Sequence, residues 1–428
     1  MSVRKRVWTT SKGIEKEAWV VDYVDKVEGG KRRLKSFEKK KDAAAYAAAA
    51  SVEVREGVHT ADSASITIAK AGEFWIAMAE RNGLERSTVE AYRQHLNLHI
   101  SPYLGTLKLS QLSAPMVREF EDKLARGDVP NKDGEPKPRS PAMVKKIRTS
   151  LSSLISDAQE RGLISRNVVR DLRAKRKRGA ERRAEKRQRG KLKIGTDIPT
   201  REEIRAVVGA LAGRWRPILL TAIFTGLRSS ELRGLRWEDV DFERGQISVR
   251  QRADRFNKIG APKSDSGERS VPLPPLVLNT LREWKIACPR RQTTDKPDGP
   301  GDLVYVFPNG AGELENHANI VNRGFVPLQI AARVTKKAGK NDADRRPIVG
   351  AKYTGLHALR HFYASWCINR RVDGGLELPA KAVQERLGHS SIVMTMDVYG
   401  HLFPRSDDGS ELADAERSLL GIRDINAT

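Results

Sequence analysis

Cysteine is scarce in this sequence of 428 residues, which contains only Cys288 and Cys367. Neither residue stands near the other or in a cluster with histidine, so the pattern excludes both a disulfide scaffold and a cysteine-based zinc site. A chain with two isolated cysteines fits a reducing compartment, and we therefore expect a cytoplasmic protein.

Long apolar runs are also missing. No stretch reaches the roughly 18 apolar residues that a membrane span needs, and no apolar run typical of a secretory signal follows the basic start MSVRKRVWTTSKG. The sequence lacks a GxxxxGK[ST] phosphate loop, and its acidic residues offer no triad of the DDE type. We therefore expect no membrane association, no use of ATP, and no metal or other cofactor.

Positive charge, in contrast, is abundant. The chain has 78 Lys and Arg residues against 54 Asp and Glu residues, a formal net charge of +24. Hydrophobic residues make up 39% of the sequence, enough for true cores, and the length suggests two or three domains. Such an excess of positive charge predicts a polyanionic partner, above all nucleic acid.

Residues 1–60 are predicted to form a small sheet with one helix. The segments VWTTS, EAWVVDYVDKV and KRRLKSF carry the aromatic and β-branched residues typical of strands, and Gly29-Gly30 suits a hairpin turn. An alanine-rich helix follows. The third strand is expected to expose four basic side chains, for which we favour DNA contact over a merely solvated face. These residues are Lys31, Arg32, Arg33 and Lys35.

The middle of the chain is predicted to be a helical bundle followed by a linker. Residues 66–170 show apolar positions at the three- and four-residue spacing of helices. Residues 171–197 are strongly basic, and such charge density resists packing into a core. This segment can act as a plain tether or lie along phosphates, and the sequence favours neither role.

Residues 198–405 form the largest predicted domain, and residues 406–428 a short tail. Thr200 and Glu203 form a capping box at the start of a helix, and Gly226 ends a buried helix. The segments QISVR and RSVPL are predicted strands, and helices dominate from there on. The whole chain is thus predicted to be mainly α with small β-sheets.

Two sequence clusters in this domain carry cations that can bind a phosphate. In TGLRSSEL, Arg228 follows a helix end, and Glu231 can hold its guanidinium from behind. In APKSDSGERSVPL, Lys263 lies in a loop between two strands, where a mobile lysine can act as a general acid. Taken alone, that segment is better explained as an ordinary hairpin with a surface lysine, and Lys258 is a nearby rival.

Two further clusters add histidines and a tyrosine. In HALRH, His357 and Arg360 are three residues apart and share one helix face, whereas His361 is expected to be structural. In LGHSSIVMTMDVYGH, His389 is predicted to open a helix whose apolar face is formed by Ile392, Val393 and Met396. Tyr399 follows His389 by ten residues. Beside two arginines and two histidines, its phenolate would be a credible nucleophile for a phosphodiester.

The four clusters, in this order within one basic chain, resemble the tyrosine recombinase (phage integrase) family. The matching motifs are TGLRSSEL, HALRH and LGHSS with MDVYGH, between residues 225 and 401. The resemblance implies site-specific cleavage and rejoining of DNA through a 3′-phosphotyrosyl intermediate, integrating and excising a phage or other mobile element. It also implies that residues 66–170 are the SAM-like core-binding domain, and that residues 1–60 resemble an arm-type DNA-binding domain.

The resemblance also implies a role for each site residue. Two arginines would clamp the scissile phosphate, a lysine would protonate the leaving 5′ oxygen, and a tyrosine would attack. One histidine would act as a general acid/base and another would hydrogen-bond the phosphate, while Glu231 would support Arg228. The two arginines are Arg228 and Arg360, the lysine is Lys263 and the tyrosine is Tyr399. The general acid/base would be His357, and the histidine bound to the phosphate would be His389.

Partners follow from the same resemblance. They would be double-stranded DNA attachment sites, a homotetramer on DNA with the tail packed on a neighbouring protomer, and possible host DNA-bending and excision factors. Two other functions compete. A type IB topoisomerase-like enzyme would use the same chemistry without strand exchange, and a non-catalytic relative would bind DNA without cutting it. The complete set of candidate catalytic residues speaks against the latter.

Overall fold

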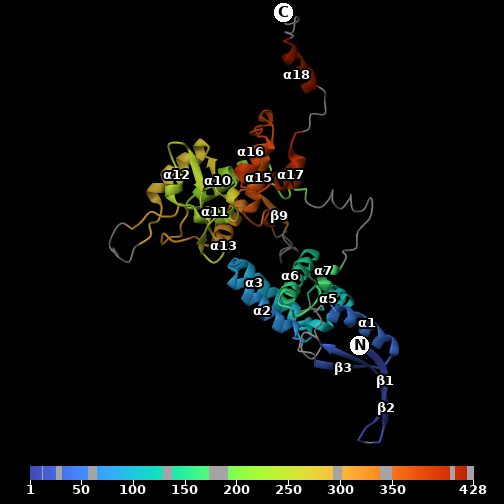
Figure 1. The fold of residues 1–428 in the computed structure, drawn as a ribbon. Helices are drawn as coiled ribbons and strands as arrows, with labels where there is room; N and C mark the ends of the chain where they lie inside the picture. The colour runs from blue at the N-terminus through green and yellow to red at the C-terminus, as the bar shows by residue number, and fades with distance from the viewer. Residues whose placement is uncertain are drawn as a thin grey trace, which may run out of the picture. The chain divides into compact units, whose positions relative to one another are not determined.

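A computed structural model describes residues 1–11, 13–25, 31–55, 65–128, 137–172, 191–292, 301–337, 349–404 and 410–421. In these ranges the fold is mainly helical with small antiparallel sheets, which confirms the predicted fold class (Figure 1). The chain divides into two compact units, 1–176 and 177–428. The predicted Gly29-Gly30 turn and most of the predicted basic linker lie outside the described residues.

The first unit begins with the predicted three-stranded sheet and helix. Strands β1 (Ser2–Thr9), β2 (Glu15–Asp25) and β3 (Lys31–Phe37) pair antiparallel in the order β1-β2-β3. Helix α1 (Lys40–Arg55) covers one face, where Val21, Tyr23 and Ala43 are buried. Strand residues alternate between the two faces, so this helix decides which side chains remain available on the other.

The basic residues of β3 are divided between these faces, contrary to the prediction that all four are exposed together. Lys35 and Arg33 pair with the buried Val21 and Tyr23, and the Lys35 ammonium lies 4.2 Å from the Tyr46 ring centroid. Arg32 faces the opposite way, and its Nε donates to Asp22 Oδ1 at 2.9 Å. The Lys31 side chain lies outside the described residues. Neighbouring side chains of a strand point to opposite faces, so a continuous basic run cannot lie on one face.

A helical bundle follows in the same unit. Its elements are α2 (Ile68–Arg81), α3 (Arg86–His95), the π-helical turn η1 (Leu96–Ile100), α4 (Ser101–Leu104), η2 (Leu109–Gln111), α5 (Ala114–Arg126), α6 (Pro141–Glu160) and α7 (Val168–Asp171). Helix α6 forms its centre, with Leu151, Leu154 and Ile155 fully buried. The predicted helical periodicity of residues 66–170 therefore corresponds to real packing.

The second unit opens with helices and a small sheet. The helices are α9 (Arg201–Gly209), α10 (Trp215–Thr225), α11 (Ser229–Gly234) and the turn η3 (Trp237–Asp239). Strands β4 (Val240–Asp241), β5 (Gln246–Val249) and β8 (Arg269–Pro272) form a sheet in the order β4-β5-β8. A hairpin of β6 (Arg252–Ala253) and β7 (Ile259–Gly260), which was not predicted, precedes the turn η4 (Asp265–Gly267).

Helices dominate the rest of this unit. They are α12 (Pro275–Ala287), α13 (His317–Asn319), the π-helical segment η5 (Ile320–Phe325) and α14 (Val326–Ala331), then α15 (His357–Ile368), η6 (Arg371–Asp373), α16 (Ala380–Leu387), α17 (Ile392–Tyr399), η7 (Gly400–Leu402) and α18 (Ser410–Leu420). A two-stranded sheet joins β9 (Thr335–Lys337) and β10 (Val349–Ala351). No helix in the described ranges is both long and apolar enough to cross a membrane.

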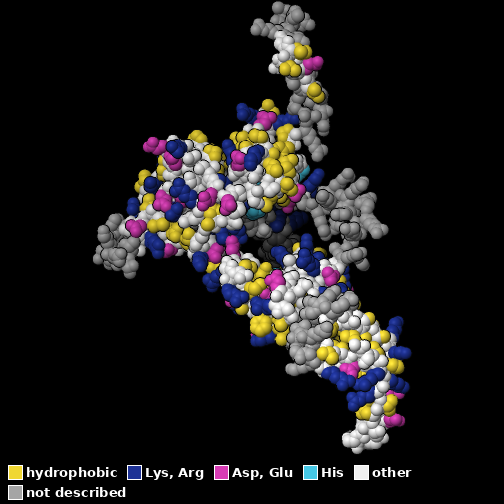
Figure 2. Space-filling model, in the orientation of Figure 1, with side chains coloured by type: hydrophobic (Ala, Val, Ile, Leu, Met, Phe, Trp, Pro, Cys, Tyr) yellow, Lys and Arg dark blue, Asp and Glu magenta, His cyan; other side chains and the backbone are white. Residues whose placement is uncertain are grey.

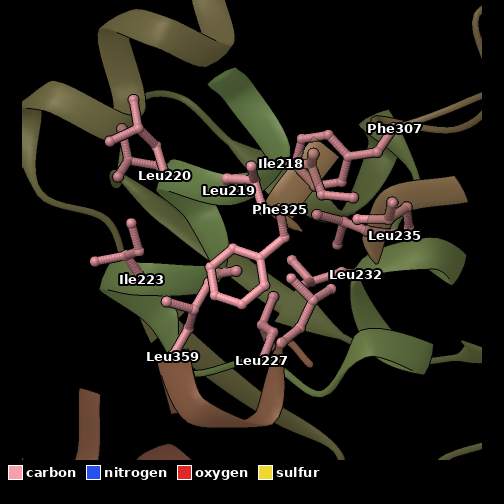
Figure 3. Close-up of a cluster of buried hydrophobic side chains, with 14 of the residues drawn as sticks. Ile218, Leu219, Leu220, Ile223, Leu227, Leu232, Leu235, Phe307, Phe325 and Leu359 are labelled. Carbon is pink, nitrogen blue, oxygen red and sulfur yellow. The ribbon is translucent and has the colours of Figure 1, made fainter. Parts of the chain in front are cut away.

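The core of the second unit lies around α10 and α15. Ile223 of α10 and Leu359 of α15 are buried together with Phe325 of η5 (Figure 3). Gly226 ends α10 in a left-handed conformation at φ 61°, and a Cβ there would lie 2.3 Å from Tyr363 Cδ1. Glycine is therefore required at this turn, and the turn fixes where the next residues, including Arg228, leave the core.

Helix α17 differs from its prediction. It begins at Ile392, with Ser391 as its cap, rather than at His389. The residues of its predicted apolar face are exposed, Val393 to 60%, whereas Thr395 and Tyr399 are buried. Hydrophobic side chains gather on the surface over α17 (Figure 2). In such a short helix the apolar residues alone do not identify the packed side.

Candidate active site

Arg228 is held at the start of α11 by Glu231. Its backbone N–H donates to Glu231 Oε2 at 2.9 Å, and its Nη1 donates to Glu231 Oε1 at 2.7 Å. The third contact runs from Nη2 to the Gly388 carbonyl at 3.1 Å. The side chain is still 34% exposed, so a guanidinium fixed from behind remains open to an anionic group.

Glu231 is itself buried, 3% exposed, and it holds a second arginine. Arg269 of β8 donates from Nη2 to Glu231 Oε2 at 2.9 Å and from Nε to the Arg386 carbonyl at 2.8 Å. Burial would raise the pKa of Glu231, but the charges of Arg269 and Arg228 outweigh it and lower that pKa. The carboxylate therefore stays ionised and links β8, α11 and the end of α16.

Arg360 of α15 approaches the same place from the core. It is 2% exposed, and it donates from Nη1 to the Gly226 carbonyl at 2.7 Å and from Nη2 to the Leu387 carbonyl at 2.5 Å. Burial first, and then the charge of Arg228, lowers the pKa of Arg360 to about 9, so the group is cationic at neutral pH. The two arginines thus bind consecutive carbonyls, of Leu387 and Gly388, just before His389.

Tyr399, at the end of α17, lies beside two histidines, His361 and His389. Its hydroxyl is 2.7 Å from His361 Nδ1, and its ring stacks parallel to that of His389, with centroids 6.3 Å apart. His357 meets the His361 ring edge-on at 4.5 Å. Burial, opposed by the charges of Arg360 and Arg228, raises the pKa of Tyr399 to about 12, so its hydroxyl needs a base if it is to attack.

His389 is fixed by its own segment. Its Nδ1 is 2.9 Å from Thr395 Oγ1, and its backbone carbonyl accepts a hydrogen bond from Gln384 Nε2. Burial first, then the charges of Arg360 and Arg228, lowers the pKa of His389 to about 4. The ring is therefore neutral at physiological pH, and its Nε2 can donate a hydrogen bond when Nδ1 accepts one from Thr395.

Lys263 is exposed in the loop between β7 and β8. That loop reaches the site at its other end, because a Cβ placed on Gly388 would lie 2.9 Å from the Ser266 carbonyl oxygen. Lys258, the rival lysine, lies in the β6–β7 turn, where its backbone N–H donates to Asp254 Oδ1. Buried Arg233 holds this hairpin through the Asp254 carbonyl and Asn257. Both lysines therefore project from anchored loops.

The structure brings Arg228, Glu231, Arg360, His389 and Tyr399 into one connected cluster, with His357 at its exposed edge. The sequence did not indicate two further members of this cluster, Arg269, which binds Glu231, and His361, which contacts Tyr399. Arg269 is the first residue of the predicted strand RSVPL, but it offers no local signal of its role, because its partner Glu231 is 38 residues away. His361 belongs to the motif HALRH, but its contact with Tyr399 depends on where α17 packs, which the motif does not indicate. The described residues contain no group of three metal-ligating side chains.

Glu231→Gln should destabilise the protein at neutral pH by about 3 kcal/mol, because it removes the charge between two arginines at a buried position. The pKa of Glu231 is lowered by folding, so its contribution is present above the ordinary glutamate value of about 4.3 and lost as the pH falls through the folded value. Urea unfolding at several pH values should show the difference from wild type closing in acid. Glu238→Gln, at an exposed ion pair with Arg236, should cost under about 0.5 kcal/mol; an equal cost would contradict the assignment.

Two family models match the chain. The one described as "Phage integrase family" matches residues 200–405, and the one described as "Phage integrase, N-terminal SAM-like domain" matches residues 68–125. The first range contains every residue of the cluster above, and the second lies within the helical bundle.

Individual proteins agree with these models. The "Tyrosine recombinase XerC-like" protein of Caldanaerobacter subterraneus subsp. tengcongensis is 25% identical over 374 residues, 82% of this chain and 83% of that protein. The ICEBs1 integrase of Bacillus subtilis (strain 168) is 26% identical over 334 residues, 76% of each chain. A structure of the Tn1549 transposon integrase in complex with transposon right end DNA shares the fold, with a TM-score of 0.57, 18% identity, and 83% of this chain and 100% of that chain covered. The chain belongs to the tyrosine recombinase (phage integrase) family and is a tyrosine-type site-specific recombinase.

Proposed function

We propose that this recombinase cleaves and rejoins duplex DNA through a 3′-phosphotyrosyl intermediate on Tyr399. The observation that carries the proposal is the joint position of Arg228 and Arg360. Their guanidinium groups bind the adjoining carbonyls of Gly388 and Leu387, beside the segment that leads to His389 and Tyr399. A phosphodiester entering this cluster would meet two cations and a phenol together.

In the proposed reaction, Tyr399 attacks phosphorus and displaces the 5′ oxygen of the broken strand. Arg228 and Arg360 offset the charge that grows on the non-bridging oxygens, and His389 donates a hydrogen bond to one of them. Lys263 protonates the leaving oxygen, and His357, at the exposed edge, serves as a further acid/base group. The covalent link retains the energy of the broken bond, so rejoining consumes no ATP.

We also propose double-stranded DNA attachment sites as the substrate, with both parts of the first unit contributing to binding. The sheet face opposite α1 carries Arg4, Arg6 and Arg32 on alternating positions, and we infer that this face contacts phosphates in an arm-type site. The helical bundle would bind the core site beside the cleaved bond. The net charge of +24 would supply salt-sensitive, largely non-specific affinity.

The assembly is proposed to be a homotetramer on DNA. In support, α18 exposes Leu412, Leu419 and Leu420, and α17 exposes an apolar surface that includes Val393. The tail of one protomer would cover such a surface on its neighbour. The protein would act in the cytoplasm of a bacterial host, integrating and excising a phage or other mobile element, with host DNA-bending and excision factors as further partners.

The test uses a nicked duplex, called here the junction duplex, that joins the DNA flanking the element on its two sides. Wild-type protein in excess EDTA should become covalently attached to this duplex and, with two intact duplexes, should exchange strands. Abolition by the chelator would contradict metal-independent chemistry. Relaxation of supercoils without any exchange product would instead identify a topoisomerase-like enzyme.

A further inference from the structure

We infer that His361 accepts the phenol proton of Tyr399 during cleavage and returns it during rejoining. This role makes His361 a further catalytic residue, because it touches the reacting oxygen. The inference rests on the proposed function of Tyr399 as the nucleophile.

The geometry places the base where it is needed. His361 Nδ1 lies 2.7 Å from the Tyr399 hydroxyl oxygen, within the distance for direct proton transfer. The rings are tilted by 61°, with centroids 5.8 Å apart, so the contact is made at the edge of the imidazole. Tyr399 is 2% exposed, so bulk water has little access to its hydroxyl and cannot readily replace an internal base.

The surroundings keep this imidazole neutral. Burial first, followed by His357 and Arg360, lowers the pKa of His361 to about 4, and Asp197 opposes them weakly. Tyr399 is the ionisable group that faces it from α17. A neutral ring can carry its proton on Nε2 and accept at Nδ1, with the phenol as donor. A phosphate bound by Arg228 and Arg360 would offset their charge and bring the histidine pKa closer to the operating pH.

The neighbouring histidines are less suited to this step. His389 uses Nδ1 for Thr395, and its ring lies parallel to that of Tyr399 with centroids 6.3 Å apart, whereas His361 is the ring whose nitrogen lies 2.7 Å from the hydroxyl. His357 is exposed, and its ring contacts His361 at 4.5 Å between centroids. His357 thus remains available to the phosphate side of the site.

The step balances without a co-reactant. The O–H bond of Tyr399 breaks and its proton passes to His361 Nδ1. The phenolate oxygen forms a bond to phosphorus, and the bond from phosphorus to the 5′ oxygen breaks. That oxygen takes a proton from Lys263 in the proposed reaction. Rejoining reverses each transfer.

The test compares His361→Gln with the wild type on the junction duplex. A glutamine carbonyl can still accept a hydrogen bond from the phenol, but it cannot take its proton, so positioning and proton transfer are separated. Adduct formation should slow by about 10²–10⁴-fold, the usual contribution of a general base. The rate of the variant should also rise steeply with pH, because a larger fraction of the Tyr399 phenol is then ionised before it attacks, whereas the wild-type rate should change little.

Two substitutions of the reactants sharpen the result. Difluorotyrosine at position 399, whose phenol ionises at lower pH, should restore much of the rate of His361→Gln. A 5′-bridging phosphorothiolate in the DNA, whose sulfur leaves without protonation, should rescue Lys263→Ala but leave His361→Gln slow. Rescue of His361→Gln by the phosphorothiolate would mean that His361 donates a proton to the leaving group, and it would overturn the inference.

His317→Gln is the matched control, because His317 is an exposed histidine of α13 in the same unit, and it should react as the wild type does. A rate for His361→Gln within about threefold of wild type would overturn the inference. A slow rate that neither pH nor difluorotyrosine raises would also overturn it, leaving a positioning role alone. In both cases the wild type would still form its adduct, so the proposed function would stand.

Discussion

Tyr399→Phe is expected to abolish the covalent protein–DNA adduct while leaving DNA affinity within about twofold of wild type, since the change removes one oxygen from a buried ring. The lost hydroxyl is the one that His361 binds at 2.7 Å, so the free energy of unfolding should fall by only about 1 kcal/mol. Denaturing electrophoresis of the junction-duplex reaction measures the adduct, and a binding titration at fixed salt measures the affinity.

Tyr363→Phe provides the control for this experiment. Tyr363 and Tyr399 lie in the same buried cluster, and both lose only a hydroxyl in the substitution. We expect Tyr363→Phe to form adduct at close to the wild-type rate. An adduct in Tyr399→Phe, or its loss in both variants, would remove Tyr399 from the role of nucleophile.

Arg360→Ala should lower the rate of adduct formation by about 10²–10³-fold, by analogy with the loss of one donor from an oxyanion hole. The same change leaves the carbonyls of Gly226 and Leu387 without the donor that they have now, so stability should fall as well. The rate is therefore measured below the unfolding transition, on protein whose circular dichroism matches that of the wild type.

Arg360→Lys separates charge from geometry in the same experiment. Lysine keeps the positive charge, but it cannot make the two parallel contacts of a guanidinium, so the variant should recover only part of the lost rate. Arg291→Ala, at an exposed ion pair with Glu313, is the matched control and should keep the wild-type rate. Full activity in Arg360→Ala would contradict the phosphate clamp.

The features that could be predicted from the sequence are those set by short-range chemistry. The capping box of Thr200 and Glu203, and the glycine that ends α10, depend on residues within one turn of each other. The salt bridge between Arg228 and Glu231 is also local, because the two residues are three positions apart. Each could be inferred from spacing alone, because a helix end offers few backbone conformations.

The features that could not be predicted depend on tertiary direction. The exposed surface of α17 follows from which side of an eight-residue helix meets α16, and the apolar residues did not indicate that side. The contact of His361 with Tyr399 joins residues 38 positions apart. The division of β3 into two faces follows from the packing of α1 on one of them. A basic run in a sequence carries no information about that choice.

Mapping of the DNA-linked peptide identifies the attacking residue itself. Wild-type protein trapped on the junction duplex would be digested, and the peptide that retains a nucleotide sequenced by mass spectrometry. We expect one modified residue, Tyr399, joined to a 3′-phosphate. Attachment to any other residue, or a link through a 5′-phosphate, would contradict it.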